Sequence, residues 1–286
     1  LVAHPDVAGV AFTGSTETAR LINRALAAKD GPIVPLIAET GGQNAMIVDS
    51  SALPEQVIDD VLISAFGAAG QRCSALRVLY VQDDVADKVI EMLKGAMAER
   101  VIGDPMDLST DIGPVIDEQA LSVLKAHREK LDRIGTLIAA MPLDDALVAR
   151  GHFFAPVAYE IPSIHELERE VFGPVLHVIR YKADELDRVI NDINATGYGL
   201  TLGVHSRISH TMDRITGDVQ VGNAYVNRTM IGAVVGVQPF GGNGLSGTGP
   251  KAGGPHYLHR FATEKVVSVD TTRQGGNAGL VTLEEN

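Results

Sequence analysis

The strongest constraint on this sequence is a repeated alternation between short apolar runs and longer segments with helical spacing. The apolar runs predict strands at residues 7–12, 33–38, 45–48, 78–81, 175–181, 199–204, 220–226 and 265–269. Apolar residues at helical spacing predict helices from Thr16, from Pro54, and over residues 85–101, 117–133 and 183–194. Strands that alternate with helices in this way are typical of an α/β fold with a largely parallel sheet.

The composition is that of a globular, acidic protein. Of 286 residues, 45% are hydrophobic, and 24 Lys and Arg stand against 36 Asp and Glu, which gives a formal net charge of −12. Because nucleic-acid binding depends on a basic surface, we expect no nucleic-acid partner. No apolar run is long enough to span a bilayer, so we expect no transmembrane segment and a cytoplasmic location. The chain begins Leu1-Val2 without an initiator Met, and we expect it to be part of a longer protein.

The single cysteine, Cys73, lies in a setting that suits a nucleophile. One cysteine excludes an intrachain disulfide and a zinc thiolate cluster, and it favours a reducing compartment. The segment from Phe66 to Ser74 ends a helical pattern with two glycines and then presents the thiol. Arg72 places a positive charge next to the sulfur in sequence, which favours the thiolate. The alternative is a buried cysteine that packs as a small apolar side chain.

A carboxylate, Glu39, closes the apolar run 33–38 and is followed by Thr40-Gly41-Gly42. A carboxylate at the end of a buried strand is costly unless it has a role, and strand ends border the ligand crevice in open α/β sheets. The alternative is a surface glutamate at a turn. A thiol together with a carboxylate is what covalent catalysis followed by hydrolysis requires.

Two other patterns are interpreted as uninformative. Residues 242–247 fit G-x-G-x-x-G, but Pro239 precedes them and Pro250 follows, so we interpret them as a loop and not as a dinucleotide-binding turn. His256 and His259 have helical spacing but no third ligand nearby in sequence, so we expect no metal site. The glycine-rich stretch 228–256 predicts a long ordered loop, and the tail from Gln274 a mobile or partner-contacting end.

Five short motifs, in order along the chain, resemble those of the aldehyde dehydrogenase superfamily. They are Phe12-Thr13-Gly14-Ser15-Thr16, Glu39-Thr40-Gly41-Gly42-Gln43-Asn44, Gly70-Gln71-Arg72-Cys73, Glu170-Val171-Phe172-Gly173-Pro174 and Pro239-Phe240-Gly241-Gly242. The resemblance implies an aldehyde dehydrogenase-like α/β fold, with a parallel-sheet catalytic domain and a truncated Rossmann-type cofactor domain. It divides the chain into a remnant of the dinucleotide-binding domain (1–40), a catalytic thiol domain (41–243) and a C-terminal wrap and tail that could serve oligomerisation (244–286).

The resemblance also implies a mechanism and a set of cofactor-binding residues. In this family the cysteine attacks the aldehyde, a hydride passes from the thiohemiacetal to a nicotinamide, and the glutamate activates the water that hydrolyses the thioester. Cys73 is thereby the nucleophile and Glu39 the general base, and the Cys73 backbone N–H contributes to an oxyanion hole. The implied cofactor is NAD, and the residues that match its binding site are Gly14, Ser15, Thr40, Gly41, Glu170 and Phe172.

Within the superfamily the chain most resembles L-glutamate-γ-semialdehyde (pyrroline-5-carboxylate) dehydrogenase domains of the bifunctional proline utilization A group. Residues 38–53, 244–255 and 275–278 carry this likeness. It implies that backbone amides of the loop 230–236 bind the substrate α-carboxylate, and that the other matching residues bind the rest of the substrate. These residues are Gly232 and Ala233 in the loop, with Phe66, Arg72, Ser74 and Phe240 around it. The alternative is that they only pack the loop.

The implied function is oxidation of L-glutamate γ-semialdehyde to L-glutamate with NAD, the last step of proline catabolism, by a homo-oligomer. FAD is expected only if a proline dehydrogenase domain lies upstream. Two alternatives stay open: a relative that takes another aldehyde or acylates CoA, and an inactive fragment that acts as a structural module. The family's upstream cofactor-binding half is absent from these residues, so we expect the isolated chain to bind cofactor weakly.

Overall fold

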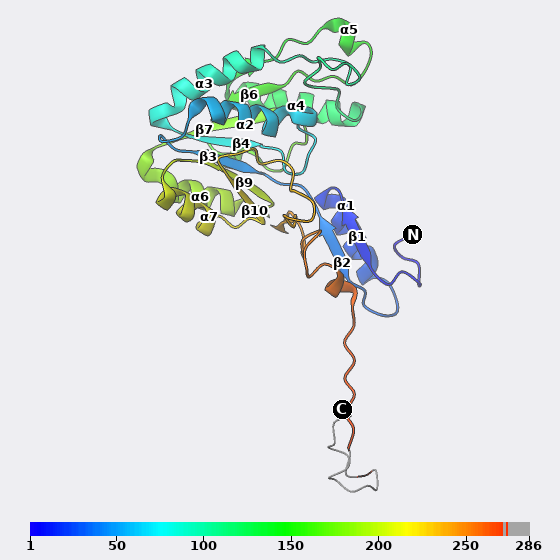
Figure 1. Ribbon diagram of the computed structural model, residues 1–286. Coiled ribbons are helices and arrows are strands. Elements are labelled where there is room, and N and C mark those ends of the chain that lie inside the picture. The colour runs from blue at the N-terminus through cyan, green and yellow to red at the C-terminus, as the bar shows by residue number, and fades with distance from the viewer. Residues whose placement is uncertain (271–272, 274–286) are drawn as a thin grey trace.

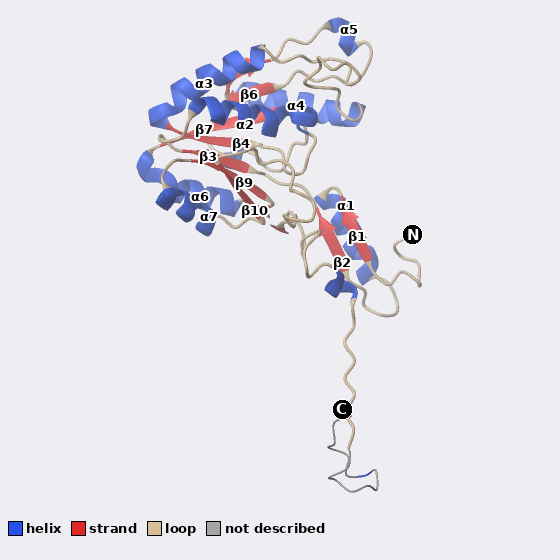
Figure 2. Ribbon diagram, viewed as in Figure 1, coloured by secondary structure: helices blue, strands red, loops and turns tan. Residues whose placement is uncertain are grey.

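The structure is a computed structural model that describes residues 1–270 and 273. It contains a small β–α–β unit and a larger layered unit (Figure 1), with helices on both faces of the larger sheet (Figure 2). The tail prediction from Gln274 and the likeness at 275–278 lie outside the described residues. None of the described helices has the length and hydropathy needed to cross a membrane.

The small unit consists of β1 (Val10–Thr13), α1 (Thr16–Ala27) and β2 (Leu36–Glu39). The two strands are parallel, and Thr13 pairs with Glu39 at their carboxyl ends. Ser15 caps α1, because its Oγ accepts from the Thr18 N–H at 3.1 Å. The strand predicted over 33–38 begins only after Pro35, which has no N–H to donate to a ladder.

The larger sheet has seven strands in the order β10-β9-β3-β4-β7-β6-β5. All neighbours are parallel except β5 and β6. The strands are β3 (Ala45–Val48), β4 (Val78–Gln82), β5 (Thr136–Ala140), β6 (Val157–Glu160), β7 (Val175–Tyr181), β9 (Thr201–His205) and β10 (Asn223–Val226). A separate short antiparallel pair joins β8 (Tyr198–Gly199) to β11 (Asn243–Gly244).

Helices connect these strands. They are α2 (Pro54–Phe66), α3 (Asp83–Ala98), α4 (Glu118–Ile134), α5 (Asp145–Val148), α6 (Leu186–Ala195) and α7 (Ser209–Asp218), with short 3-10 turns η1 (Gly67–Gly70), η2 (Ile164–Glu166), η3 (Ala183–Glu185) and η4 (Leu258–Phe261). In Figure 1, α2 and α3 lie on one side of the sheet, and α6 and α7 on the other. Pro54 begins α2, as a proline at the first helical turn should.

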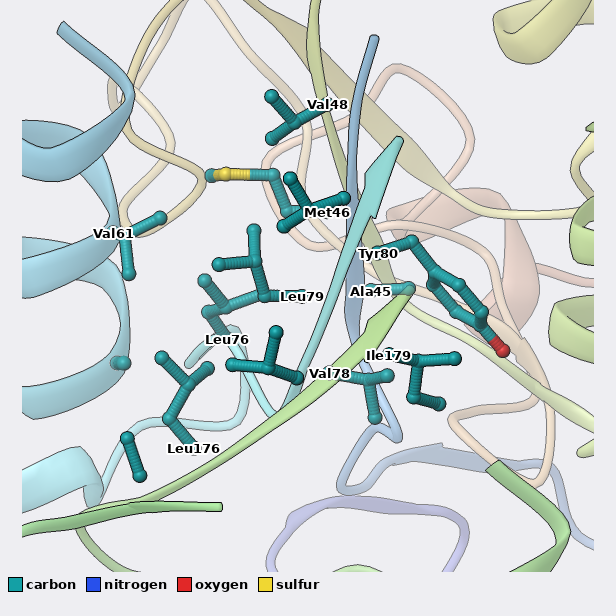
Figure 3. Close-up of a cluster of buried hydrophobic side chains, with 14 of the residues drawn as sticks. Ala45, Met46, Val48, Val61, Leu76, Val78, Leu79, Tyr80, Leu176 and Ile179 are labelled. Atoms are coloured by element: carbon teal, nitrogen blue, oxygen red, sulfur yellow. The ribbon is translucent and has the colours of Figure 1, made fainter. Parts of the chain in front are cut away.

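The core lies where α2 packs on the central strands. Every residue of β3 and β4 is buried. Successive strand residues alternate between faces, so Leu79 points toward α2 while Tyr80 points to the opposite face (Figure 3). Val61 of α2 contributes to the same cluster. This packing fixes the segments that lead into β3 and β4, and those segments carry the motif residues.

The structure confirms most predicted elements and corrects one. The strand predicted over 265–269 is wrong: the segment pairs with no strand among the described residues, and Val266, Val267 and Val269 are 90%, 71% and 60% exposed. Its valines look strand-like, but no strand among residues 1–270 pairs with it. The sequence analysis did not predict β5, β6 or α7. The loop predicted over 228–256 is confirmed apart from the two residues of β11.

The motif segments meet where the two units join. Residues 40–44, 70–77, 170–174 and 220–222 all precede strands of the larger sheet, so they lie at its amino ends. Gly14 and Glu39 instead lie at the carboxyl ends of β1 and β2. The backbone joins the two: the Gly14 N–H donates to the Glu39 carbonyl oxygen at 3.1 Å. The candidate site is therefore built between strand ends of opposite polarity.

Candidate active site

The thiol is presented by a sharp turn after α2. Ala68 and Ala69 have φ of 53° and Gly70 has φ of 64°, so three consecutive residues are left-handed. Such a conformation costs about 1–2 kcal/mol for each residue that carries a side chain. Gly70 is also closely packed, because a Cβ there would lie 2.3 Å from the Gly173 carbonyl oxygen. The turn changes the direction of the chain after α2, and Cys73 is partly exposed.

Asn44 holds the backbone on either side of the thiol. Its Nδ2 donates to the carbonyl oxygens of Cys73 at 2.6 Å and Ala75 at 2.9 Å. Its Oδ1 accepts from the Thr201 N–H at 3.2 Å. Two contacts of this buried amide therefore restrain the backbone at Cys73, and the third anchors the amide to β9.

The thiol itself is not acidified. Burial raises the pKa of Cys73 above its usual value, the negative charges of Glu170 and Glu39 raise it further, and backbone N–H groups only partly oppose this. The expectation that Arg72 favours the thiolate is therefore wrong. Arg72 is adjacent in sequence, but the charges that reach the sulfur come from the two carboxylates. Near neutral pH the resting sulfur is protonated and needs a base.

Glu39 has the properties of such a base. Its Oε2 accepts from the Gly242 N–H at 3.1 Å, while its Oε1 is buried without a partner. Gly241 makes room for it, since a Cβ there would lie 2.7 Å from Oε1. Burial raises the pKa of Glu39 to about 7, against the opposing effects of the Gly242 N–H and the Lys251 charge. The carboxyl can therefore take up and release protons at neutral pH.

A cavity of about 600 Å³ opens over the thiol. It brings together most of the predicted substrate residues. Its lining includes Arg72, Cys73, Ser74, Gly232, Ala233 and Phe240. Glu39 is not part of this lining, but its charge raises the pKa of the Cys73 thiol, so the two groups are within electrostatic reach.

Phe66 is not brought to this cavity. Its side chain is 1% exposed within the core at the end of α2, and it borders a separate hollow of about 170 Å³ beside Arg100 and Asp111. The left-handed turn at Ala68 and Ala69 separates Phe66 from the thiol.

The loop 230–236 offers unused backbone donors to the cavity. Gly232 has φ of 74° and faces open space, since a Cβ there would meet nothing within 4 Å. Within the described chain, the backbone N–H groups of Gly232 and Ala233 have no acceptor. The loop is anchored at one end by Ser64, whose Oγ accepts from the Met230 N–H at 3.2 Å. Unpaired N–H groups around a left-handed glycine can form a nest for an anion.

Arg77 organises the other side of the thiol and was missed by the sequence analysis. Its guanidinium, 1% exposed, donates to the carbonyl oxygens of Gly70, Gly173 and Arg72 at 2.7, 3.0 and 3.2 Å. It also pairs with Glu170 Oε1 at 3.0 Å and lies 5.2 Å from the centre of the Phe172 ring. Breaking a buried pair of this kind typically costs about 3–5 kcal/mol. The signal in the sequence was a charged residue between Leu76 and the apolar run of β4.

Glu170 connects this arginine to Gly41, in the segment that joins the two units. A Cβ on Gly41 would lie only 1.6 Å from Glu170 Oε2, so the carboxylate rests directly on that glycine. Burial raises the pKa of Glu170, although Arg77 opposes the shift. Thr40 is held beside it, with Oγ1 donating to the Leu245 carbonyl oxygen at 2.6 Å. Phe172 is 43% exposed.

The predicted cofactor residues therefore gather around the junction. Gly14 and Ser15 form the turn before α1, whose amino end presents backbone N–H groups. Thr40, Gly41 and Glu170 follow on the side of the larger sheet. Across the residues that the structure describes, no group of three or more His, Cys, Asp or Glu side chains could hold a metal ion.

Comparison with known proteins agrees with this geometry. The model of the aldehyde dehydrogenase family matches residues 1–267. The chain is 55% identical over 284 residues to the bifunctional protein PutA of Escherichia coli (strain K12), covering 96% of this chain and 22% of that protein. It is 37% identical over 273 residues to a 1-pyrroline-5-carboxylate dehydrogenase of Geobacillus sp. (strain WCH70), covering 94% of this chain and 52% of that protein.

Solved structures give the same picture. A crystal structure of bifunctional proline utilization A superposes with a TM-score of 0.90 at 64% identity, covering 95% of this chain and 27% of that one. A 1-pyrroline-5-carboxylate dehydrogenase from Thermus with bound NAD superposes with a TM-score of 0.84 at 34% identity, covering 91% of this chain and 50% of that one. The chain thus spans about a fifth of the curated PutA proteins that it matches.

Proposed function

This chain belongs to the aldehyde dehydrogenase family, and we propose from that premise that it oxidises L-glutamate γ-semialdehyde to L-glutamate with NAD. The observation that carries the proposal is the arrangement around Cys73. A thiol that needs a base lies within electrostatic reach of a carboxyl with a pKa of about 7. The cavity over the thiol also contains two backbone N–H groups that have no acceptor among the described residues.

The first step forms a carbon–sulfur bond. Cys73 Sγ attacks the aldehyde carbon while Glu39 takes the thiol proton, which the pKa of about 7 allows at neutral pH. The Cys73 N–H, fixed through Asn44, donates to the developing oxyanion of the thiohemiacetal. When bound, NAD supplies the acceptor for the hydride that leaves this carbon, and Cys73 is left as a thioester. Glu39 first releases the thiol proton to solvent, which its pKa of about 7 allows, and then removes a proton from water as that water attacks the thioester carbonyl. The carbon–sulfur bond breaks to release the acid, and the proton held by Glu39 returns to the sulfur.

The residues of this chain suit NAD. We propose that the turn Gly14-Ser15 and the amino end of α1 hold the pyrophosphate, because the helix dipole and the N–H groups of the first helical turn favour an anion there. Glu170, fixed by Arg77 and lying on Gly41, is placed to accept from ribose hydroxyls. Thr40 and Phe172 complete the proposed site. The name of the NAD-bound Thermus relative supports the choice of cofactor.

The substrate carboxylate is proposed to bind the Gly232 and Ala233 amides, with Arg72, Ser74 and Phe240 around the rest of the molecule. Phe66, buried behind the turn, is proposed to support the site from the core and not to touch substrate. The division at residues 40 and 243, a homo-oligomeric state and a cytoplasmic location remain part of the proposal. FAD enters only if an upstream proline dehydrogenase domain exists.

The substrate can be tested with paired aldehydes. In the full-length gene product, glutamate semialdehyde is expected to show a kcat/KM at least about 100-fold above that of butanal, because each of the two charge-assisted hydrogen bonds to the amides contributes about 1.5–3 kcal/mol. The readout is the rate of NAD reduction, followed by absorbance at about 340 nm. Equal kcat/KM values for the two aldehydes would contradict the proposed carboxylate-binding role of the amides. Release of product that depends on CoA would favour the acylating alternative.

Gly41→Ala tests the close contact between Gly41 and the Glu170 carboxylate. The added methyl group would overlap Glu170 Oε2, so the carboxylate must move away from the ribose position. We expect KM for NAD to rise by about tenfold or more, which corresponds to about 1.4 kcal/mol, while Cys73 stays open to iodoacetamide. Gly95→Ala serves as a control, because a Cβ at that helical glycine meets nothing within 4 Å. An unchanged KM for NAD would show that Glu170 does not contact the cofactor.

A further inference from the structure

The positive charge that acts on Glu39 comes from Lys251, a half-buried residue of the C-terminal loop. Its ammonium group is held by the carbonyl oxygen of Gly222 and by Asn223 Oδ1, the latter at 3.3 Å. Two acceptors therefore fix the position of a side chain that would otherwise be free to swing into solvent.

The same residues that hold Lys251 also reach Glu39. Asn223 Oδ1 accepts from the Gly241 N–H at 3.4 Å, and its Nδ2 donates to the Pro239 carbonyl oxygen at 3.0 Å. Gly241 packs against Glu39 Oε1, and Gly242 donates to Oε2 at 3.1 Å. Glu39 therefore contacts the short segment 239–242 directly, and Lys251 is linked to the same segment through Asn223.

Their unused hydrogen-bonding groups are complementary. An ammonium group has three N–H donors, and Lys251 uses two of them on Gly222 and Asn223. Glu39 Oε1 is buried and has no partner among the described residues. A spare donor and a spare acceptor therefore belong to one network that runs through Asn223 and residues 241–242, although no hydrogen bond joins them in this conformation.

The other ionisable group that faces Glu39 is Cys73, which is itself influenced by Glu170. Cys73 and Glu170 are each neutral or negative, so neither favours the ionised form of Glu39. Lys251 is the positive group that offsets them.

We propose that Lys251 is a positioning residue for hydrolysis of the thioester: its fixed ammonium group keeps Glu39 ionised and offers Oε1 a donor when the carboxylate turns. This rests on the proposed covalent mechanism and adds to it. Lys251 touches neither substrate nor cofactor. Hydrolysis is the step in which its role is tested, because water activation needs Glu39 in its charged form.

The test uses Lys251→Met and Lys251→Arg in the full-length gene product, with 4-nitrophenyl acetate as the probe. This ester acylates Cys73 without NAD or glutamate semialdehyde, so the result is independent of the natural substrate. The steady-state rate after the initial burst reports hydrolysis. For Lys251→Met we expect the midpoint of its acidic limb to rise by about one pH unit, which is the effect of removing a nearby opposite charge. Lys251→Arg should restore the parent midpoint.

Below the midpoint the Met variant should be about tenfold slower, and at high pH it should converge on the parent. The burst amplitude should not change. An unshifted midpoint, or an equal loss at every pH, overturns the proposal. Lys251→Gln provides a second neutral variant if the Met variant unfolds. Failure of glutamate semialdehyde as a substrate would leave this shift in place, so the two proposals are separable.

Discussion

Cys73→Ala is expected to reduce NAD-dependent aldehyde oxidation by a factor of about 10⁴ or more, because the covalent intermediate can no longer form. The large size of this effect follows from the site. The cavity over the thiol offers no other nucleophile of comparable strength: its neighbour Ser74 is buried and carries a hydroxyl. The measurement is kcat/KM at saturating NAD, together with alkylation of the peptide that carries residue 73.

Cys73→Ser is the matched control, since it keeps the size and polarity of the side chain. It should be nearly as inactive as the alanine variant, because a serine hydroxyl is a far weaker nucleophile at neutral pH. Both variants should melt close to the parent temperature. A Cys73→Ala protein that retains more than about a hundredth of the parent rate would sink the assignment of the nucleophile.

Glu39→Gln is expected to slow turnover by about 10²–10⁴-fold, the usual contribution of a general base. Glutamine preserves the shape and can accept from Gly242, but it cannot remove a proton from water. Acylation proceeds slowly through residual thiolate, so the thioester should accumulate and be visible by intact mass spectrometry. Glu99→Gln, an exposed carboxylate at the end of α3, is the control and should behave as the parent.

The pH dependence of the parent follows from the same residue. Glu39 acts as a base only when ionised, and its pKa is raised from 4.5 to about 7. Turnover should therefore rise with pH through about 7, and the acidic limb should be absent in Glu39→Gln. The folded state holds this carboxyl protonated at pH values where the unfolded chain has lost the proton. Its ionisation therefore opposes folding as pH rises from 4.5 toward 7. At about pH 8, roughly one unit above the pKa of Glu39, Glu39→Gln should not lower the melting temperature.

The spacing of apolar residues was sufficient to predict the helices and strands that border the site. β3 and β7 have the predicted bounds, α2 begins at Pro54, and Glu39 closes β2 as expected. The residues that were missed act through space. Arg77 and Lys251 are separated from Glu170 and Glu39 by long stretches of chain, and only the packing of the sheet brings them together. The position of Arg77 between Leu76 and the apolar run of β4 hints at burial, but its partner is known only once the sheet is packed.

The location of the site was also beyond simple rules. Ligands in open α/β sheets are expected at the carboxyl ends of the strands. That holds here for β1 and β2, but the thiol precedes β4 and lies at the amino end of the larger sheet. The left-handed run from Ala68 to Gly70 explains why: it redirects the chain before the strand begins, and a helical pattern followed by glycines does not specify that direction.

The junction between the two units assigns base and nucleophile to different layers of the protein. Glu39 is the last residue of the small sheet, whereas Cys73 is carried by the framework of the large one. Whatever tilts one layer against the other, including a neighbouring domain or subunit, changes the separation of the two groups without altering either side chain.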